Sequence, residues 1–299
     1  MMKESGESYE QTYTWFTRFD TFCVRIKRIF FTCVIGLICA LLLFVSIILI
    51  YFTNIVYKSH ELDDTALVQK VTTLPELQAA TSPNTDFIAL YDAPEPVLIA
   101  GPSEVSPYVV KALIAAEDDQ FYLHNGVLPK AVVRAIYQDI FQHPFATGGS
   151  TITQQLIKNQ ILSNERTYNR KAKEIMYAMR IEKLMTKDEI IFTYLNRVPF
   201  GLDTNGQHIT GITSAAYGIF GKAPSELNIA ESAYITGLLQ SPYYYTPFDQ
   251  HGQLRPKSEM APSINRQRYV LKRMLIEQMI THKEYEEALT YNIPQHLNP

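Results

Sequence analysis

The chain has 299 residues, 46% of them hydrophobic, and a formal net charge of −3. This length allows one or two domains with a sizeable core. The slightly acidic balance argues against the basic surface that nucleic-acid binding requires, so we expect no nucleic-acid partner.

An apolar run without charges covers residues 29–52. It is longer than the roughly 20 residues that a helix needs to cross a bilayer. Cations at positions 25, 27 and 28 precede the run, and mainly acidic residues follow it. The positive-inside rule therefore predicts a cytoplasmic tail at 1–28, a single-pass transmembrane anchor at 29–52 and an outer part beyond it. A cleaved signal peptide is the alternative, but its apolar core is usually only about 7–15 residues long.

The segment after the anchor, residues 53–104, is predicted to be an extracytoplasmic linker. Short strands are expected at 87–91 and 96–100, where prolines interrupt apolar runs. The pattern beyond is mainly α-helical and shows no internal repeats. We expect helices to begin near residues 107, 130, 151, 165, 187, 211, 228, 263 and 282. The three cysteines all lie in or beside the anchor, so the outer part holds together without disulfides.

The helix predicted from Pro107 carries a carboxylate on its apolar face. Val110, Leu113, Glu117 and Phe121 fall on one stripe at helical spacing. A carboxylate among apolar side chains has its pKa raised towards the range that is useful for proton transfer. Glu117 is therefore a candidate for proton transfer. The alternative is an ordinary acid at a helix end, paired with an Arg or a Lys.

A second apolar stripe follows. Val133, Ile136, Tyr137, Ile140 and Phe141 recur at three- and four-residue intervals. A helix packed in the core explains this pattern. In a membrane-anchored protein, the same stripe also suits a helix that dips into the bilayer surface. The sequence leaves both interpretations open.

A glycine-containing turn leads into the next predicted helix. Gly148 and Gly149 are followed by Ser150 and Thr151. The free amides and the dipole at a helix start favour anions, and Lys158, roughly two turns further on, would add a positive charge. Capping of the helix by a hydroxyl group explains the turn as well, although the two adjacent glutamines and the lysine favour a ligand site.

A basic helix comes next. Arg166, Arg170, Lys171 and Lys173 lie close together, with Glu174 among them. Arg170 and Glu174 are four residues apart, which is the spacing of an everyday exposed ion pair of little energetic value. Four neighbouring cations also suit a phosphate or pyrophosphate ligand.

Five segments together carry a family resemblance. They are residues 117–126 (EDDQFYLHNG), 148–159 (GGSTITQQLIKN), 170–174 (RKAKE), 187–201 and 211–242. In this order they resemble the five signatures of the peptidoglycan glycosyltransferases of glycosyltransferase family 51.

The resemblance implies a lysozyme-like, two-lobed helical catalytic domain at 105–250, followed by a helical extension at 251–299. It implies polymerisation of lipid II into glycan strands, with inversion at the donor anomeric carbon and release of undecaprenyl pyrophosphate. The protein would act at a bacterial cell membrane. Its partners would be lipid II, the growing strand, the membrane and other proteins of cell-wall synthesis.

The resemblance also implies residue roles. Glu117 matches the general base, which takes the proton of the acceptor 4-hydroxyl group. Glu174 matches a glutamate near the donor pyrophosphate that is linked to a divalent metal, Mg or Mn. Lys158, Arg166 and Arg170 would neutralise the leaving pyrophosphate, and Lys171 would assist on the acceptor side. The remaining positions match cleft-lining residues: Ser150, Gln154, Gln155 and Asn196.

The chain departs from the family pattern at two places. The link from Gly201 to Gly211 is longer than usual, and Phe192 stands where a glutamate is common. The Ser-x-x-Lys and Lys-Thr-Gly motifs of a penicillin-binding transpeptidase domain do not occur. The chain is thus either a monofunctional enzyme or the first part of a bifunctional one.

Two other functions compete with this interpretation. A wall-cleaving muramidase or lytic transglycosylase also pairs a glutamate with a lysozyme-like fold, but it needs neither the cations nor a lipid-facing stripe. An inactive, membrane-anchored scaffold of wall synthesis would have no need of Glu117 or Glu174.

Overall fold

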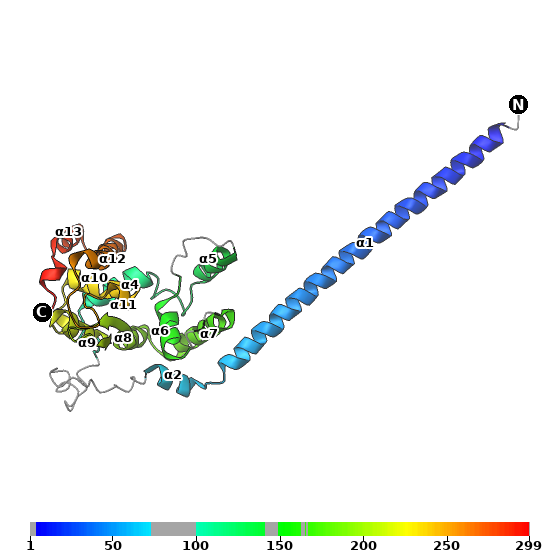
Figure 1. Ribbon diagram of the computed structural model, residues 1–299. Coiled ribbons are helices and arrows are strands. Elements are labelled where there is room, and N and C mark those ends of the chain that lie inside the picture. Colours follow the sequence, from blue (N-terminus) through cyan, green and yellow to red (C-terminus); the bar gives the residue numbers. More distant parts are fainter. Residues whose placement is uncertain (1–3, 73–99, 141–148, 163–164, 166, 299) are drawn as a thin grey trace. The chain divides into compact units, whose positions relative to one another are not determined.

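The computed structural model describes residues 4–72, 100–140, 149–162, 165 and 167–298 (Figure 1). The chain divides into two compact units, an N-terminal unit of residues 1–58 and a C-terminal unit of residues 59–299. The N-terminal unit is formed by helix α1 (Glu4–Ser59). Within α1, Trp15–Ser59 is the stretch of the described chain that is long and apolar enough to cross a membrane. This stretch includes the predicted anchor.

The C-terminal unit is almost entirely helical, which confirms the prediction of a mainly α fold. Two groups of helices lie side by side in Figure 1, with α5, α6 and α7 in one and α4, α10, α12 and α13 in the other. The helices are α2 (Asp64–Thr72), α4 (Pro107–Glu117), α5 (Pro129–Ile140), α6 (Ile152–Gln160), α7 (Tyr168–Leu184), α8 (Lys187–Arg197), α9 (Ile212–Phe220), α10 (Ile229–Leu238), α11 (Pro242–Tyr245), α12 (Lys257–Ile276) and α13 (His282–Thr290). Two strands, β1 (Pro199–Leu202) and β2 (His208–Thr210), pair in an antiparallel hairpin.

Most helix starts lie close to their predicted positions because local capping fixes them. Thr151, Thr186, Asn228 and Thr281 each form a capping box with the third residue of the helix that follows. Such a cap is worth about 1 kcal/mol. The start predicted near residue 263 is wrong: α12 begins at Lys257 and runs through Pro262. The predicted strands at 87–91 and 96–100 lie almost wholly outside the described residues.

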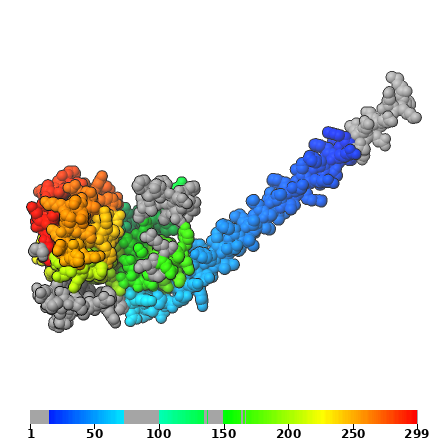
Figure 2. All heavy atoms as spheres, in the orientation of Figure 1, coloured from blue at the N-terminus to red at the C-terminus, as the bar shows by residue number. Residues whose placement is uncertain are grey.

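Helix α10 is the centre of the core. Every residue from Ala230 to Leu238 is buried, and α10 packs against both α4 and α12, which also contact each other. Figure 2 shows the atoms of α12 and α13 (orange to red) on one side of the C-terminal unit and those of α6 and α7 (green) on the other. Residues 251–299 therefore belong to the same compact unit as the helices of the family signatures.

Two short loops repeat one structure, although no internal repeat is visible in the sequence. In Asp203–Gln207 and in Asp249–Gln253, the aspartate Oδ1 accepts the N–H groups of the second and fourth residues after it. Leu202 pairs with His208 around the first loop, and Phe248 pairs with Leu254 around the second. The five-residue pattern Asp-x-x-Gly-Gln is too short to stand out from the sequence.

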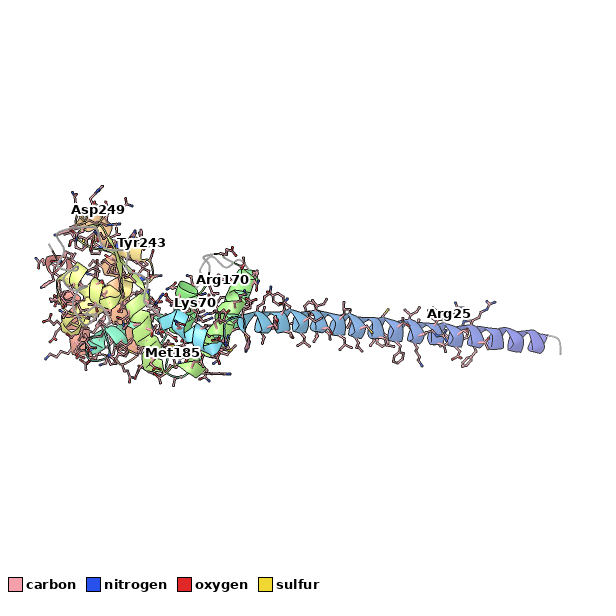
Figure 3. The ribbon with its side chains drawn as sticks, turned by 90° about the horizontal axis from the view of Figure 1, so that it is seen from below. Arg25, Lys70, Arg170, Met185, Tyr243 and Asp249 are labelled. Atoms are coloured by element: carbon pink, nitrogen blue, oxygen red, sulfur yellow. The ribbon has the colours of Figure 1, made fainter. Side chains whose placement is uncertain are left out.

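These two loops, which we call the paired loops, contact each other through their glycines. Gly206 and Gly252 both have φ near +70°, the left-handed region that favours glycine. A Cβ on Gly206 would collide with the backbone of Gln250, and one on Gly252 would collide with the backbone of Thr204. The longer link between Gly201 and Gly211 is thus an ordered structural element. Figure 3 shows Asp249 in a part of the unit distant from Arg170.

Candidate active site

A cleft of about 1310 Å³ lies in the C-terminal unit. Residues from α4, α5, α6, α8 and α12 line it, together with residues of the connecting segments. Its polar and charged side chains include Glu117, Asp119, Lys130, Arg134, Ser150, Gln155, Lys158, Tyr194, Gln240, Arg266, Tyr269 and Arg273. Four predicted site residues are therefore brought together here: Glu117, Ser150, Gln155 and Lys158.

Glu117 is the last residue of α4, and each of its carboxylate oxygens has a partner. Gln155 Nε2 donates to Oε2 at 3.1 Å, and Arg266 Nη2 donates to Oε1 at 3.0 Å. The Oε1 of Gln155 in turn accepts from the Tyr194 hydroxyl group at 2.9 Å. Burial raises the pKa of Glu117, while Gln155 and Arg266 act in the opposite direction. Glu117 is thus a helix-end acid paired with an arginine, as the alternative interpretation predicts. However, both residues of this ion pair line the cleft.

Asp118 and His124 form a buried support for this end of the helix. The Oδ2 of Asp118 accepts from His124 Nε2 at 2.9 Å and from the backbone N–H of Ile152 at 3.0 Å. The N–H of Gly126 donates to His124 Nδ1, so His124 carries its proton on Nε2. The pair ties the end of α4 to the start of α6. His124 is thus a structural residue.

Glu174 lies on α7 in a cluster of charges. Its side chain is only 2% exposed. Arg170 Nη1 contacts Oε2 at 3.1 Å, and Lys171 Nζ contacts Oε1. Lys171 also donates to the hydroxyl group of Ser150, a cleft residue, at 2.8 Å. The alternative of an everyday exposed ion pair is wrong for Glu174, because its carboxylate is buried and holds two cations next to the cleft.

This cluster does not fit a ready-made metal site. No group of three or more His, Cys, Asp or Glu residues that could hold an ion occurs in the described part of the chain. Both oxygens of Glu174 are already bound to cations. Hard divalent ions need several oxygen ligands. We therefore derive no chemical step through a metal.

Two residues that were predicted to line the cleft, Gln154 and Asn196, lie outside it and contact the backbone. Gln154 is buried, and its Oε1 accepts the N–H of Thr151 as part of the capping box. Asn196 exchanges two hydrogen bonds of 2.9 Å with the backbone of Ala100. Neither lines the cleft. The Asn196 amide is used in chain packing, whereas Gln154 uses only its oxygen in the cap and its buried Nε2 has no partner among the described residues. Arg166 lies outside the described residues.

Three cleft residues on α12 were not predicted from the sequence: Arg266, Tyr269 and Arg273. Their spacing of three and four residues places them on one face of the helix. The Arg266 guanidinium lies over the Tyr269 ring at 4.6 Å. Arg273 binds the backbone carbonyl of Ala115 and the carboxylate of Asp119. The spacing was visible in the sequence, but nothing local indicated that this face meets Glu117.

The apolar stripe on α5 is exposed where the structure describes its side chains. Val133 is 67% exposed and Tyr137 is 57% exposed. The interpretation of the stripe as core is therefore wrong for these two residues. The side chains of Ile136 and Ile140, like all of Phe141, are outside the described part.

Comparison with known proteins identifies the domain. Residues 88–275 match the family model described as Transglycosylase, a range that includes all the residues lining the cleft. The chain belongs to the transglycosylase family. It is 40% identical over 187 residues to penicillin-binding protein 1A of Escherichia coli K12, a match covering 62% of this chain and 20% of that protein.

Other relatives extend the match. Identity is 34% over 263 residues with penicillin-binding protein 1A of Vibrio cholerae, covering 88% of this chain and 29% of the relative. It is 34% over 228 residues with penicillin-binding protein 1F of Bacillus subtilis, covering 76% and 30%. The transglycosylase chain thus spans about a fifth to a third of these relatives. The chain carries a peptidoglycan glycosyltransferase domain.

Proposed function

We propose that the chain polymerises lipid II into glycan strands, with inversion at the donor anomeric carbon and release of undecaprenyl pyrophosphate. The observation that carries this proposal is the Glu117 carboxylate, which faces a large cleft and is held at both oxygens by hydrogen-bond donors. Family membership supports the same reaction class.

Glu117 acts as the general base. It accepts the proton of the acceptor 4-hydroxyl group as that oxygen bonds to the donor anomeric carbon. The bond from this carbon to the pyrophosphate oxygen breaks, and the leaving group takes the electron pair. A single displacement inverts the carbon. A retaining route would need a second carboxylate as nucleophile. The other two carboxylates that line the cleft are engaged, Asp118 with His124 and Asp119 with Arg273.

Cations around the cleft stabilise the leaving pyrophosphate. Lys158 lines the cleft and forms no ion pair with any residue that the structure describes. Lys171 donates a hydrogen bond to Ser150 at the edge of the cleft, and Arg170 is paired with the neighbouring Glu174 carboxylate. Positive groups placed where negative charge develops lower the barrier. We retain the divalent metal and the role of Arg166 as predictions.

Membrane anchoring completes the proposal. Helix α1 would cross the cell membrane with its N-terminus in the cytoplasm, because cations precede its apolar part. The exposed Val133 and Tyr137 of α5 suit a helix that touches the outer surface of the bilayer. The cleft would then lie near the lipid-linked substrates. Other wall-synthesis proteins remain predicted partners.

The test is to incubate the purified full chain with lipid II and a divalent metal, with E117Q as the inactive control. Long glycan strands in the wild type alone support the proposal. Cleavage of preformed peptidoglycan would instead show a muramidase or lytic transglycosylase. Absence of both activities would favour the inactive scaffold.

A further inference from the structure

Helix α12 places a full positive charge against the candidate base. The Arg266 side chain is 13% exposed and that of Glu117 is 14% exposed, so water screens this pair only partly. Tyr269 lies under the guanidinium and limits its movement. Arg266 is the one cation within hydrogen-bond distance of Glu117 among the residues that the structure describes.

We propose that Arg266 is a positioning residue of the glycosyl transfer: it holds Glu117 ionised and in a fixed orientation, so that α12 is part of the active site. This inference rests on the proposed role of Glu117 as the base. It assigns to helix α12 a task that none of the five signature segments performs.

The hydrogen bonds around Glu117 favour its charged form. Tyr194 donates its hydroxyl proton to Gln155 Oε1, which turns the Nε2 amide group towards Glu117. Arg266 has only donors. Both neighbours therefore offer protons to Glu117 and neither offers an acceptor for a protonated carboxyl group. Each carboxylate oxygen has about two acceptor positions, so each retains one for a substrate hydroxyl group.

The remaining charges near Glu117 do not replace Arg266. Asp118 acts against ionisation, but it is bound to His124. Arg273, on the same face of α12, is engaged with Asp119 and Glu277. Lys158 lines the cleft without contacting Glu117.

Burial thus raises the pKa of Glu117, and Gln155 and Arg266 counteract it. A base works only above its pKa, so activity rises with pH through that value. Loss of Arg266 removes a counteracting charge and moves this rise to higher pH. A neighbouring arginine lowers a carboxyl pKa by about 1–3 units, which sets the expected size of the shift.

The experiment compares R266M, R266K and R268M in the full chain. Arg268 lies exposed on the same helix and forms no ion pair with a described residue, so R268M is the matched control. We measure kcat/KM against pH, and we follow the titration of the Glu117 carboxyl group by 13C NMR, with E117Q identifying its signal.

We expect the acid limb and the Glu117 titration of R266M to move up by about 1–3 pH units. R266K, which retains the charge without the planar fork, should lie in between, and R268M should match the wild type. Activity of R266M should recover at high pH. If R266M does not fold, an upward shift in R266K supports the proposal.

An unchanged titration in R266M, or in R266K if only that variant folds, overturns the proposal and leaves Arg266 as a contact between helices. The titration needs no substrate. If the wild type makes no glycan, or if E117Q remains active, the proposed function fails while the effect of Arg266 on Glu117 is still measured.

Discussion

Glu117 is the residue on which the proposed chemistry depends most directly. Replacement by Gln keeps the shape and the contact with a donor but cannot accept the acceptor proton. We expect polymerisation of lipid II by E117Q to fall by about 10²-fold or more, because general-base catalysis is usually worth that much. Binding of lipid II should stay close to that of the wild type. Activity within about tenfold of the wild type would contradict the role of Glu117 as base.

Lys158 permits a second test at this scale. The side chain is exposed in the cleft and forms no ion pair within the described chain. Lys158→Met keeps the aliphatic stem and removes the charge, so the melting temperature should barely change while turnover falls by about 10²-fold. Lys183→Met, at an exposed position on α7, is the matched control. A marked loss of stability with normal turnover would show that Lys158 is structural.

The predicted site residues separate into two groups for a physical reason. Glu117 and Lys158, which motif spacing marks, line one cleft, because helix periodicity and capping decide which face each occupies. The Gln154 side-chain oxygen and the Asn196 amide group bind the backbone away from the cleft, which composition cannot reveal. Arg266 was invisible because its contact joins residues 149 positions apart in the chain. Local patterns carry no information about such pairs.

At the scale of elements, α5 exposes two apolar side chains of its predicted stripe, Val133 and Tyr137. Val133→Asp combined with Tyr137→Asp should weaken binding of residues 54–299 to anionic liposomes and leave the melting temperature nearly unchanged, because both side chains are largely exposed. Ile276→Asp, at an exposed apolar position on α12, is the control. If the double variant binds liposomes normally, or if it unfolds, the membrane contact is wrong.

The helices also show where sequence patterns suffice. The starts of α4, α6, α8, α10 and α13 follow from caps and prolines within three or four residues, so they were predictable. The start of α12 was not predictable, because a proline usually ends or precedes a helix, whereas Pro262 lies inside this one. The hairpin of β1 and β2 was missed because its strands have only four and three residues.

At the scale of the whole molecule, the paired loops connect two segments that lie far apart in the sequence. Gly206→Ala should destabilise the protein by about 2–4 kcal/mol, since it combines a strained backbone conformation with a collision against Gln250. Denaturant unfolding measures this change. Gly101→Ala is the control, because its Cβ would meet only the flexible Glu104 side chain. If the two variants have equal free energies of unfolding, the paired loops accommodate the added Cβ without loss of stability.

The position of the paired loops also has a kinetic consequence. Residues 207–251 lie between the two glycines and include α9, α10 and α11. A contact that closes so long a segment forms only after those helices have assembled, because the entropy of closure must be paid before the contact is gained. Substitutions at Gly206 or Gly252 should therefore accelerate unfolding and leave the refolding rate almost unchanged. The paired loops would then set how long the folded molecule lasts, and hardly affect how quickly it forms.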